Sequence, residues 1–166
     1  SNTVVGRSAM STNTTGACNV AIGQNALLQN TEGNTNVAVG RFALDNNTTA
    51  DSNTAVGYES LGANTTGANN TAVGFDSLKA NTTGCLNVAV GKSALCTNTT
   101  GCTNTAIGRD AMLANTTGDF NVAVGHEALD SNTTANENTA IGAASLAANT
   151  TGSQLTAIGK DSLKDN

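Results

Sequence analysis

Apolar and small polar residues recur along this chain with a strict period of 17 positions. Nine full repeats and 13 further residues make up the 166-residue chain, without an insertion or deletion. We number the positions of the repeat as columns 1 to 17 from Ser1. Gly occupies column 6 in all ten units and column 16 in seven of nine. A fixed period of this length is typical of a solenoid, in which each repeat stacks on the next.

Two segments of each repeat carry the apolar side chains. Columns 2–5, as in "NTAVG" at residues 53–57, alternate at period two. This predicts a short strand with columns 3 and 5 directed into the core and column 4 directed away from it. Column 10 is Leu or Met in every unit, but six residues between turns make a poor helix, so a second extended segment is expected there. We therefore predict an all-β fold, a parallel β-solenoid forming one repeat domain over residues 1–166, with coils roughly 4.8 Å apart.

Asn is the most regular polar residue of the repeat. It occupies column 2 in every unit except at Leu155, and column 13 in all nine full repeats. Stacked Asn side chains can bond backbone groups of their own loop and of the next coil, which a thin core would otherwise leave unpaired. The predicted column-13 ladder consists of Asn13, Asn30, Asn47, Asn64, Asn81, Asn98, Asn115, Asn132 and Asn149.

Column 4 is Ala in nine of ten units, with Val4 as the exception. Directed away from the core, this stripe of methyl groups would suit close packing against another sheet, although a solvent-facing stripe that keeps the coil narrow is the alternative. The interface candidates are Ala21, Ala38, Ala55, Ala72, Ala89, Ala106, Ala123, Ala140 and Ala157.

The "NVAIG", "NTAIG" and "NVAVG" runs, followed by Ala or Ser and Leu, resemble the head repeats of trimeric autotransporter adhesins (YadA-like heads). The "NTTG…NTAVG" pattern is similar to repeats of phage and algal-virus tail fibres. The resemblance covers the whole chain, although its unit is longer than the usual adhesin-head repeat. It implies a left-handed β-roll, an extracellular location on a cell or virion surface, self-association as a trimer or filament, and contact with host surfaces or glycans.

The leading hypothesis is thus a structural or adhesive fibre that assembles laterally or end to end. The chain starts in register and ends four columns short of a full repeat, so we expect a fragment or a protomer of a longer array. An ice-binding solenoid is the first alternative, because regular Thr ladders can order water. A protein that binds or cleaves polysaccharide is the second.

Composition argues against several other classes. A net charge of -5 without a basic stripe disfavours nucleic acid as a partner. The chain has no apolar run for membrane insertion. The "GKS" at residues 91–93 has Leu86 where a phosphate loop needs Gly. The "NTTG" turn lacks the Asp of calcium-binding β-rolls. We therefore expect no cofactor and no metal.

Charged residues gather in columns 7 and 8. Two carboxylate pairs there, Glu59 with Asp76 and Asp110 with Glu127, lie one coil apart, near the roughly 5 Å separation in retaining glycosidases. Basic residues in column 7 favour a solvated stripe of mixed charge instead, so no enzyme activity is expected. His126, the single His, is expected to be exposed.

Four cysteines and a set of Asn-x-Thr sequences complete the candidate chemistry. Cys85 and Cys102 share column 17 in consecutive coils, so their Cα atoms should lie about 5 Å apart, within disulfide range. Cys96 is a competitor, Cys18 has no obvious partner, and free thiols are the alternative. Asn-x-Thr is a glycosylation acceptor unless its Asn points inward. Candidate acceptors in column 13 are Asn13, Asn47, Asn64, Asn81, Asn98, Asn115, Asn132 and Asn149.

Overall fold

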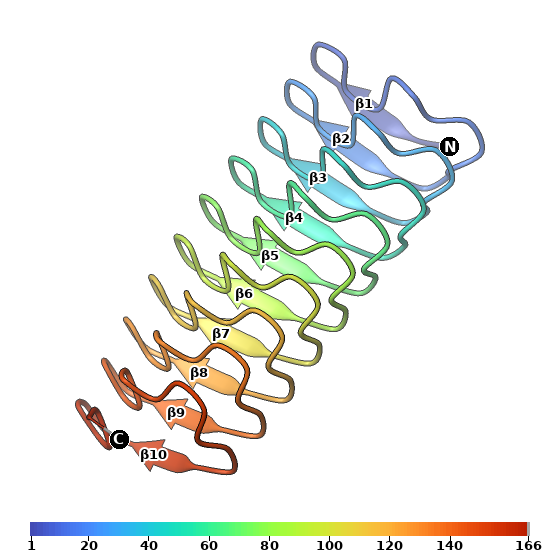
Figure 1. The fold of residues 1–166 in the computed structure, drawn as a ribbon. Coiled ribbons are helices and arrows are strands. Elements are labelled where there is room, and N and C mark those ends of the chain that lie inside the picture. Colours follow the sequence, from blue (N-terminus) through green and yellow to red (C-terminus); the bar gives the residue numbers. More distant parts are fainter. Residues whose placement is uncertain (166) are drawn as a thin grey trace.

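A computed structural model describes residues 1–165 and shows a parallel β-solenoid, which confirms the predicted fold class. Each repeat forms one coil with one short strand, and the ten strands follow one another in chain order in a single sheet (Figure 1). None of the described residues lies in a helix. The strands are β1 (Thr3–Val5), β2 (Val20–Ile22), β3 (Val37–Val39), β4 (Thr54–Val56), β5 (Thr71–Val73), β6 (Val88–Val90), β7 (Thr105–Ile107), β8 (Val122–Val124), β9 (Thr139–Ile141) and β10 (Thr156–Ile158).

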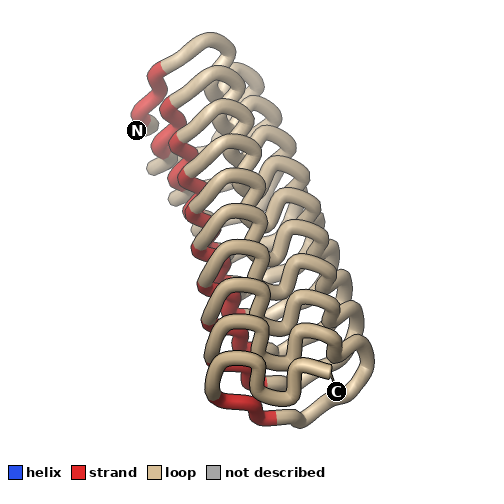
Figure 2. The backbone as a smooth tube through the Cα atoms, turned by 90° about the vertical axis from the view of Figure 1, so that its left-hand side faces the viewer, coloured by secondary structure: helices blue, strands red, loops and turns tan. Residues whose placement is uncertain are grey.

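Adjacent strands pair with no shift of the repeat, so each column stacks on itself. Ala55, for example, pairs with Ala38 on one side and Ala72 on the other. The coils consequently form a single stack in which every strand lies directly beside the next (Figure 2). Because every repeat has 17 residues, one misplaced residue would break the alignment of all the columns that follow it.

The inner and outer faces of each strand are reversed relative to the prediction. Column 4 points into the coil, and columns 3 and 5 point out of it: Ala89 is fully buried while its neighbours Val88 and Val90 are partly exposed. The coil interior already holds the column-10 Leu or Met and a small column-9 residue, so only a methyl group fits opposite them. The interface prediction for column 4 is wrong, because these side chains are buried: Ala21, Ala38, Ala55, Ala72, Ala89, Ala106, Ala123, Ala140 and Ala157.

The second apolar segment is an irregular arch and not a strand, which corrects that prediction. Its backbone alternates between right-handed and left-handed conformations, with positive φ at columns 8 and 10, as at Ser93 (φ 57°) and Leu95 (φ 51°). A left-handed conformation costs about 1–2 kcal/mol for a residue with a Cβ. It persists at Leu95 because the side chain is fully buried. Hydrogen bonds also alternate in direction: Leu95 N–H donates to Ala111 of the next coil and Ser93 N–H to Phe75 of the previous one.

The predicted column-13 ladder is confirmed. Asn98 Nδ2 donates to Asn81 Oδ1 of the previous coil at 2.8 Å and to the Gly101 carbonyl of its own turn at 2.9 Å. Column 2 forms a second ladder. Asn87 Nδ2 donates to the same Gly101 carbonyl at 2.8 Å, and its Oδ1 accepts from Asn104 N–H at 2.9 Å. The two ladders therefore converge on one carbonyl in each coil.

The invariant Gly of column 6 ends each strand because no other residue fits there. Gly91 has a φ of +135°, and a Cβ built on it would lie 2.5 Å from the carbonyl oxygen of Gly108 in the next coil. Both the backbone conformation and the close approach of the coils therefore require Gly.

We expect Asn87→Ala to lower the free energy of unfolding by about 2–4 kcal/mol, because Asn104 N–H would lose its acceptor inside the coil. Thr100→Ala, at an exposed position of the same repeat, should change it by less than about 0.5 kcal/mol. Urea denaturation of the two variants measures the difference. Equal midpoints would show that the column-2 ladder does not hold the coils together.

Candidate functional site

The outer face of the ten-stranded sheet is a regular surface that runs along the rod. We call the side chains of columns 3 and 5 the β-face. They are Thr3, Val5, Val20, Ile22, Val37, Val39, Thr54, Val56, Thr71, Val73, Val88, Val90, Thr105, Ile107, Val122, Val124, Thr139, Ile141, Thr156 and Ile158. Fourteen of these 20 are Val or Ile, six are Thr, and none is charged.

The β-face is accessible along the whole rod. Ile107 and Ile141 expose 40% and 39% of their surface, and the Val residues of the central coils are partly exposed. The strands lie side by side in one continuous strip (Figure 2), so the β-branched side chains form two parallel ladders on a pleated surface, where such residues pack well. Contiguous exposed apolar surface is a common feature of protein interaction sites.

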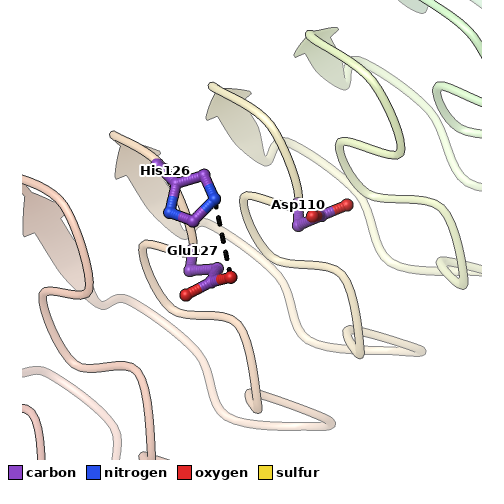
Figure 3. A group of neighbouring side chains, drawn as sticks. All are labelled: Asp110, His126 and Glu127. Atoms are coloured by element: carbon purple, nitrogen blue, oxygen red, sulfur yellow. Dashed lines mark ion pairs between the residues drawn. The ribbon is translucent and has the colours of Figure 1, made fainter.

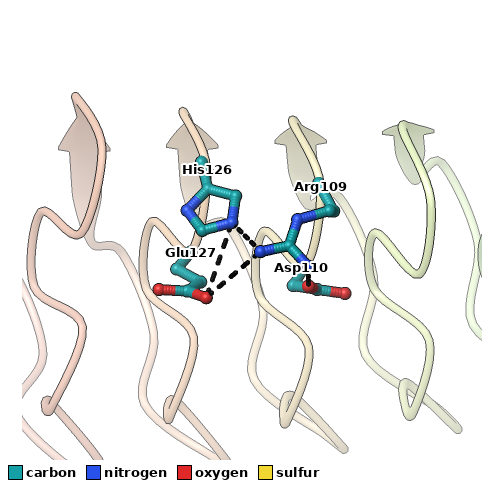
Figure 4. Close-up of polar contacts among 4 residues, drawn as sticks. All are labelled: Arg109, Asp110, His126 and Glu127. Carbon is teal, nitrogen blue, oxygen red and sulfur yellow. Dashed lines mark hydrogen bonds and ion pairs between the residues drawn. The ribbon is translucent and has the colours of Figure 1, made fainter.

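The charged stripe of columns 7 and 8 contains a cluster of four side chains. A His126 nitrogen and carboxylate oxygens of Asp110 and Glu127 all lie within 4.8 Å of one another (Figure 3). Arg109 contacts all three: its Nη1 lies 3.1 Å from Asp110 Oδ2, its Nη2 lies 3.5 Å from Glu127 Oε1, and its guanidinium bonds the His126 ring (Figure 4). The sequence prediction of neighbouring carboxylates and an exposed His126 is confirmed.

The residue types of this cluster suit a divalent cation, but Arg109 stands among them as their counter-charge. A cation would have to displace the guanidinium from both carboxylates. Asp130 lies nearby, and the pKa of its carboxyl is raised by burial and by the charges of Glu127 and Asp110. The arrangement is therefore a mixed-charge network at the surface, as the basic residues of column 7 indicated. Exposed ion pairs of this type contribute little to the free energy of unfolding.

A second cluster involves aromatic residues that the sequence analysis did not single out. The Tyr58 and Phe75 rings stack with centroids 5.1 Å apart, Phe42 meets Tyr58 edge to face at 6.1 Å, and the Arg41 guanidinium lies 4.5 Å from the centre of the Phe42 ring. The signal was present in the sequence, because three of the four aromatic residues fall in columns 7 and 8 of consecutive repeats.

The carboxylates Glu59 and Asp76 lie beside this aromatic cluster and share one ammonium group. Lys79 Nζ is 2.6 Å from Glu59 and 3.5 Å from Asp76. Hydrogen bonds from Lys79 and Tyr58 lower the pKa of Glu59. The Lys79 cation therefore bridges the predicted pair of carboxylates. This arrangement is typical of a surface ion-pair network and not of two catalytic carboxyl groups that face each other across a substrate.

The cysteines lie as the repeat predicts. The sulfur atoms of Cys85 and Cys102 are 2.8 Å apart as free thiols, and Cys85 N–H donates to the Cys102 sulfur at 3.0 Å. The hydrogen bond with Cys102, together with burial, raises the pKa of Cys85 to about 11. Cys96 is partly buried and Cys18 is exposed.

The Asn-x-Thr sequences of column 13 do not present their acceptor nitrogens at the surface. In seven of the eight candidates the side chain is buried, and its amide donates inside the coil, as at Asn64. A glycan there would prevent the coil from closing. Asn13, in the first coil, is half-buried. The buried candidates are Asn47, Asn64, Asn81, Asn98, Asn115, Asn132 and Asn149.

No family model, curated protein or solved structure matches this chain. Residues 1–165 include no helix that could span a membrane.

Oxidised glutathione should convert Cys85 and Cys102 to an intrachain disulfide, each thiol losing one proton and one electron as the oxidant is reduced to two thiols. The disulfide would join residues 17 positions apart. Closing a loop of that length should raise the free energy of unfolding by about 3 kcal/mol. Peptide mapping and thermal unfolding measure both effects. A Cys18→Ser/Cys96→Ser variant should form the same disulfide and gain the same stability as the wild type. In the wild type, a disulfide from Cys96 to Cys85 or to Cys102 would contradict the prediction.

Proposed function

We propose that this chain is a structural rod that associates with other copies of itself through the β-face, as part of an extracellular fibre. The observation that carries the proposal is the uncharged, β-branched face that runs along all ten strands. The side chains of columns 3 and 5 would form the lateral contact, and not the Ala stripe of column 4, which is buried. The extracellular location rests on the resemblance of the repeats to adhesin heads and tail fibres.

A second copy of the chain fits the β-face for two reasons. Every copy has the same 17-residue repeat, so the ladders of two rods keep the same spacing over their whole length. The contact would also remove Val and Ile surface from water without burying a charge, at about 25 cal/mol per Å² of apolar area. The six Thr hydroxyls can bond across the contact or retain water at its edge.

Lysines at Val73 and Val90 test this proposal, because they place two charges in the middle of the β-face. We expect the wild type to sediment as an oligomer at about 0.1 mM and the Val73→Lys/Val90→Lys variant to sediment as a monomer with unchanged circular dichroism. The matched control is Thr83→Lys/Thr100→Lys, which adds the same charge to the same two coils at exposed positions of another column. A monomeric wild type, or an oligomeric β-face variant, would reject the proposal.

Ice binding is the second candidate, and the outward direction of column 3 favours it. Thr occupies six of the ten column-3 positions on the exposed face, and column 15 adds a ladder of exposed Thr on another turn, as at Thr83 and Thr100. Regular, uncharged arrays of Thr and Val on a flat sheet can hold water at a fixed spacing.

Thermal hysteresis of the same purified samples separates the two candidates. If the rod binds ice, the wild type should depress the freezing point below the melting point as a monomer, and Val73→Lys/Val90→Lys should remove most of the effect. Absence of hysteresis in the wild type would exclude ice binding and leave the assembly experiment unaffected.

A further inference from the structure

A pocket interrupts the surface where one repeat lacks a side chain. Column 11 carries a side chain in every repeat except the fourth, where Gly62 stands between Asp45 and Lys79. The missing side chain leaves a cavity of about 300 Å³. Its walls are Phe42 and Asp45 of one coil, Lys79 two coils further on, and Glu59 of the coil between them.

One polar atom of the pocket has no partner among residues 1–165. The Asp45 Oδ1 atom is buried and accepts no hydrogen bond there. Burial and the neighbouring charge of Glu59 raise the pKa of this carboxyl. A polar group that is removed from water without a partner is unfavourable by the amount of its lost hydration. A ligand that donates a hydrogen bond to Asp45 would restore that interaction.

The other polar groups of the pocket are held in place. Lys79 Nζ bonds Glu59 Oε2 at 2.6 Å and approaches Asp76 at 3.5 Å, so one of its three N–H donors remains for a ligand. Asn46 Nδ2 donates to the Gly62 carbonyl at 2.7 Å, which fixes the amide at the edge of the pocket and leaves its oxygen as an acceptor. Donors and acceptors are thus present within one small volume.

The apolar part of the pocket is an aromatic ring. Phe42 lines the cavity, and its orientation is fixed by the edge-to-face contact with Tyr58 and by the Arg41 guanidinium. A ring held in this way offers apolar surface to the C–H groups of a ligand, while the carboxylate, amide and ammonium groups face its polar edge.

The charges of the pocket select an uncharged ligand with many hydroxyls. Asp45 and Glu59 oppose an anion, and the burial that raises the pKa of Asp45 weakens the attraction of this carboxyl for a cation. A purely apolar ligand would leave Asp45 without a partner. We propose that the pocket formed at Gly62 binds one hexose unit of a neutral polysaccharide, with the sugar ring against Phe42 and hydroxyls bonded to Asp45 and Lys79. Its residues belong to columns 7 to 12, so the proposal is independent of the β-face.

Filling the pocket is the direct test. Leu28 and Leu113 occupy column 11 in other coils, so the backbone accepts Leu at this position. A Cβ on Gly62 meets its nearest atom, the Glu59 carbonyl oxygen, at 3.2 Å, which requires a shift of a few tenths of an ångström. Gly62→Leu should therefore fold and block the cavity. Ala147→Leu is the matched control, because it adds Leu to the same column four coils or more from the pocket.

Affinity electrophoresis in gels that contain dextran, laminarin, mannan or galactan measures binding. Wild type and Ala147→Leu should be retarded by at least one of these polysaccharides, and Gly62→Leu by none. Asp45→Asn, which keeps the shape of the pocket, should weaken binding about tenfold or more. Val73→Lys/Val90→Lys should still bind, which separates this proposal from self-association. Absence of retardation of the wild type, or equal retardation of wild type and Gly62→Leu, would overturn it.

Discussion

The rod depends on the hydrogen bonds that Asn side chains form between coils. Each coil is too thin to bury much apolar surface: in the sixth coil the interior holds Ala89, Ala94 and Leu95 together with Asn87 and Asn98. Asn87 and Asn98 both donate to the Gly101 carbonyl, and each is bonded to the equivalent Asn of an adjacent coil or to its backbone. The interior is therefore held as much by amide bonds as by apolar contact, and each Asn contributes fully only when coils lie on both sides of it.

The same narrow interior determines what the rod presents to its surroundings. Because the Ala side chain of each strand fills the space opposite the column-10 Leu or Met, the β-branched residues on either side must lie on the outer surface. In a thicker sheet protein these Val and Ile side chains would form the core. Here the residues that favour a strand also form the exposed face. The narrow interior therefore accounts both for the buried Ala column and for the exposed β-branched face.

Much of the fold could be predicted from the sequence, because the period alone requires stacked coils and the columns then assign each ladder. Which face of the strand points into the coil could not be predicted. Alternation at period two separates two faces but does not say which one is inside, and residue size favoured Val and Ile over Ala. The left-handed backbone at Leu95 also has no sequence signal, because Leu rarely adopts it. The pocket at Gly62 depends on which side chains of three coils meet around one glycine, and this becomes visible only in the folded structure. The left-handed sense of the coil remains an expectation from the resemblance.

The alternating direction of the bonds between coils has an electrostatic consequence. The N–H groups of Val88 and Leu95 point toward the next coil, whereas those of Gly91 and Ser93 point toward the previous one. Peptide dipoles therefore partly cancel within each repeat, whereas those of an α-helix all point the same way along its axis. The cancellation is incomplete, because the N–H groups of Thr97 and Thr99 also point toward the next coil. An array of such coils can therefore grow with a weaker electrical polarity than a helix of the same number of residues.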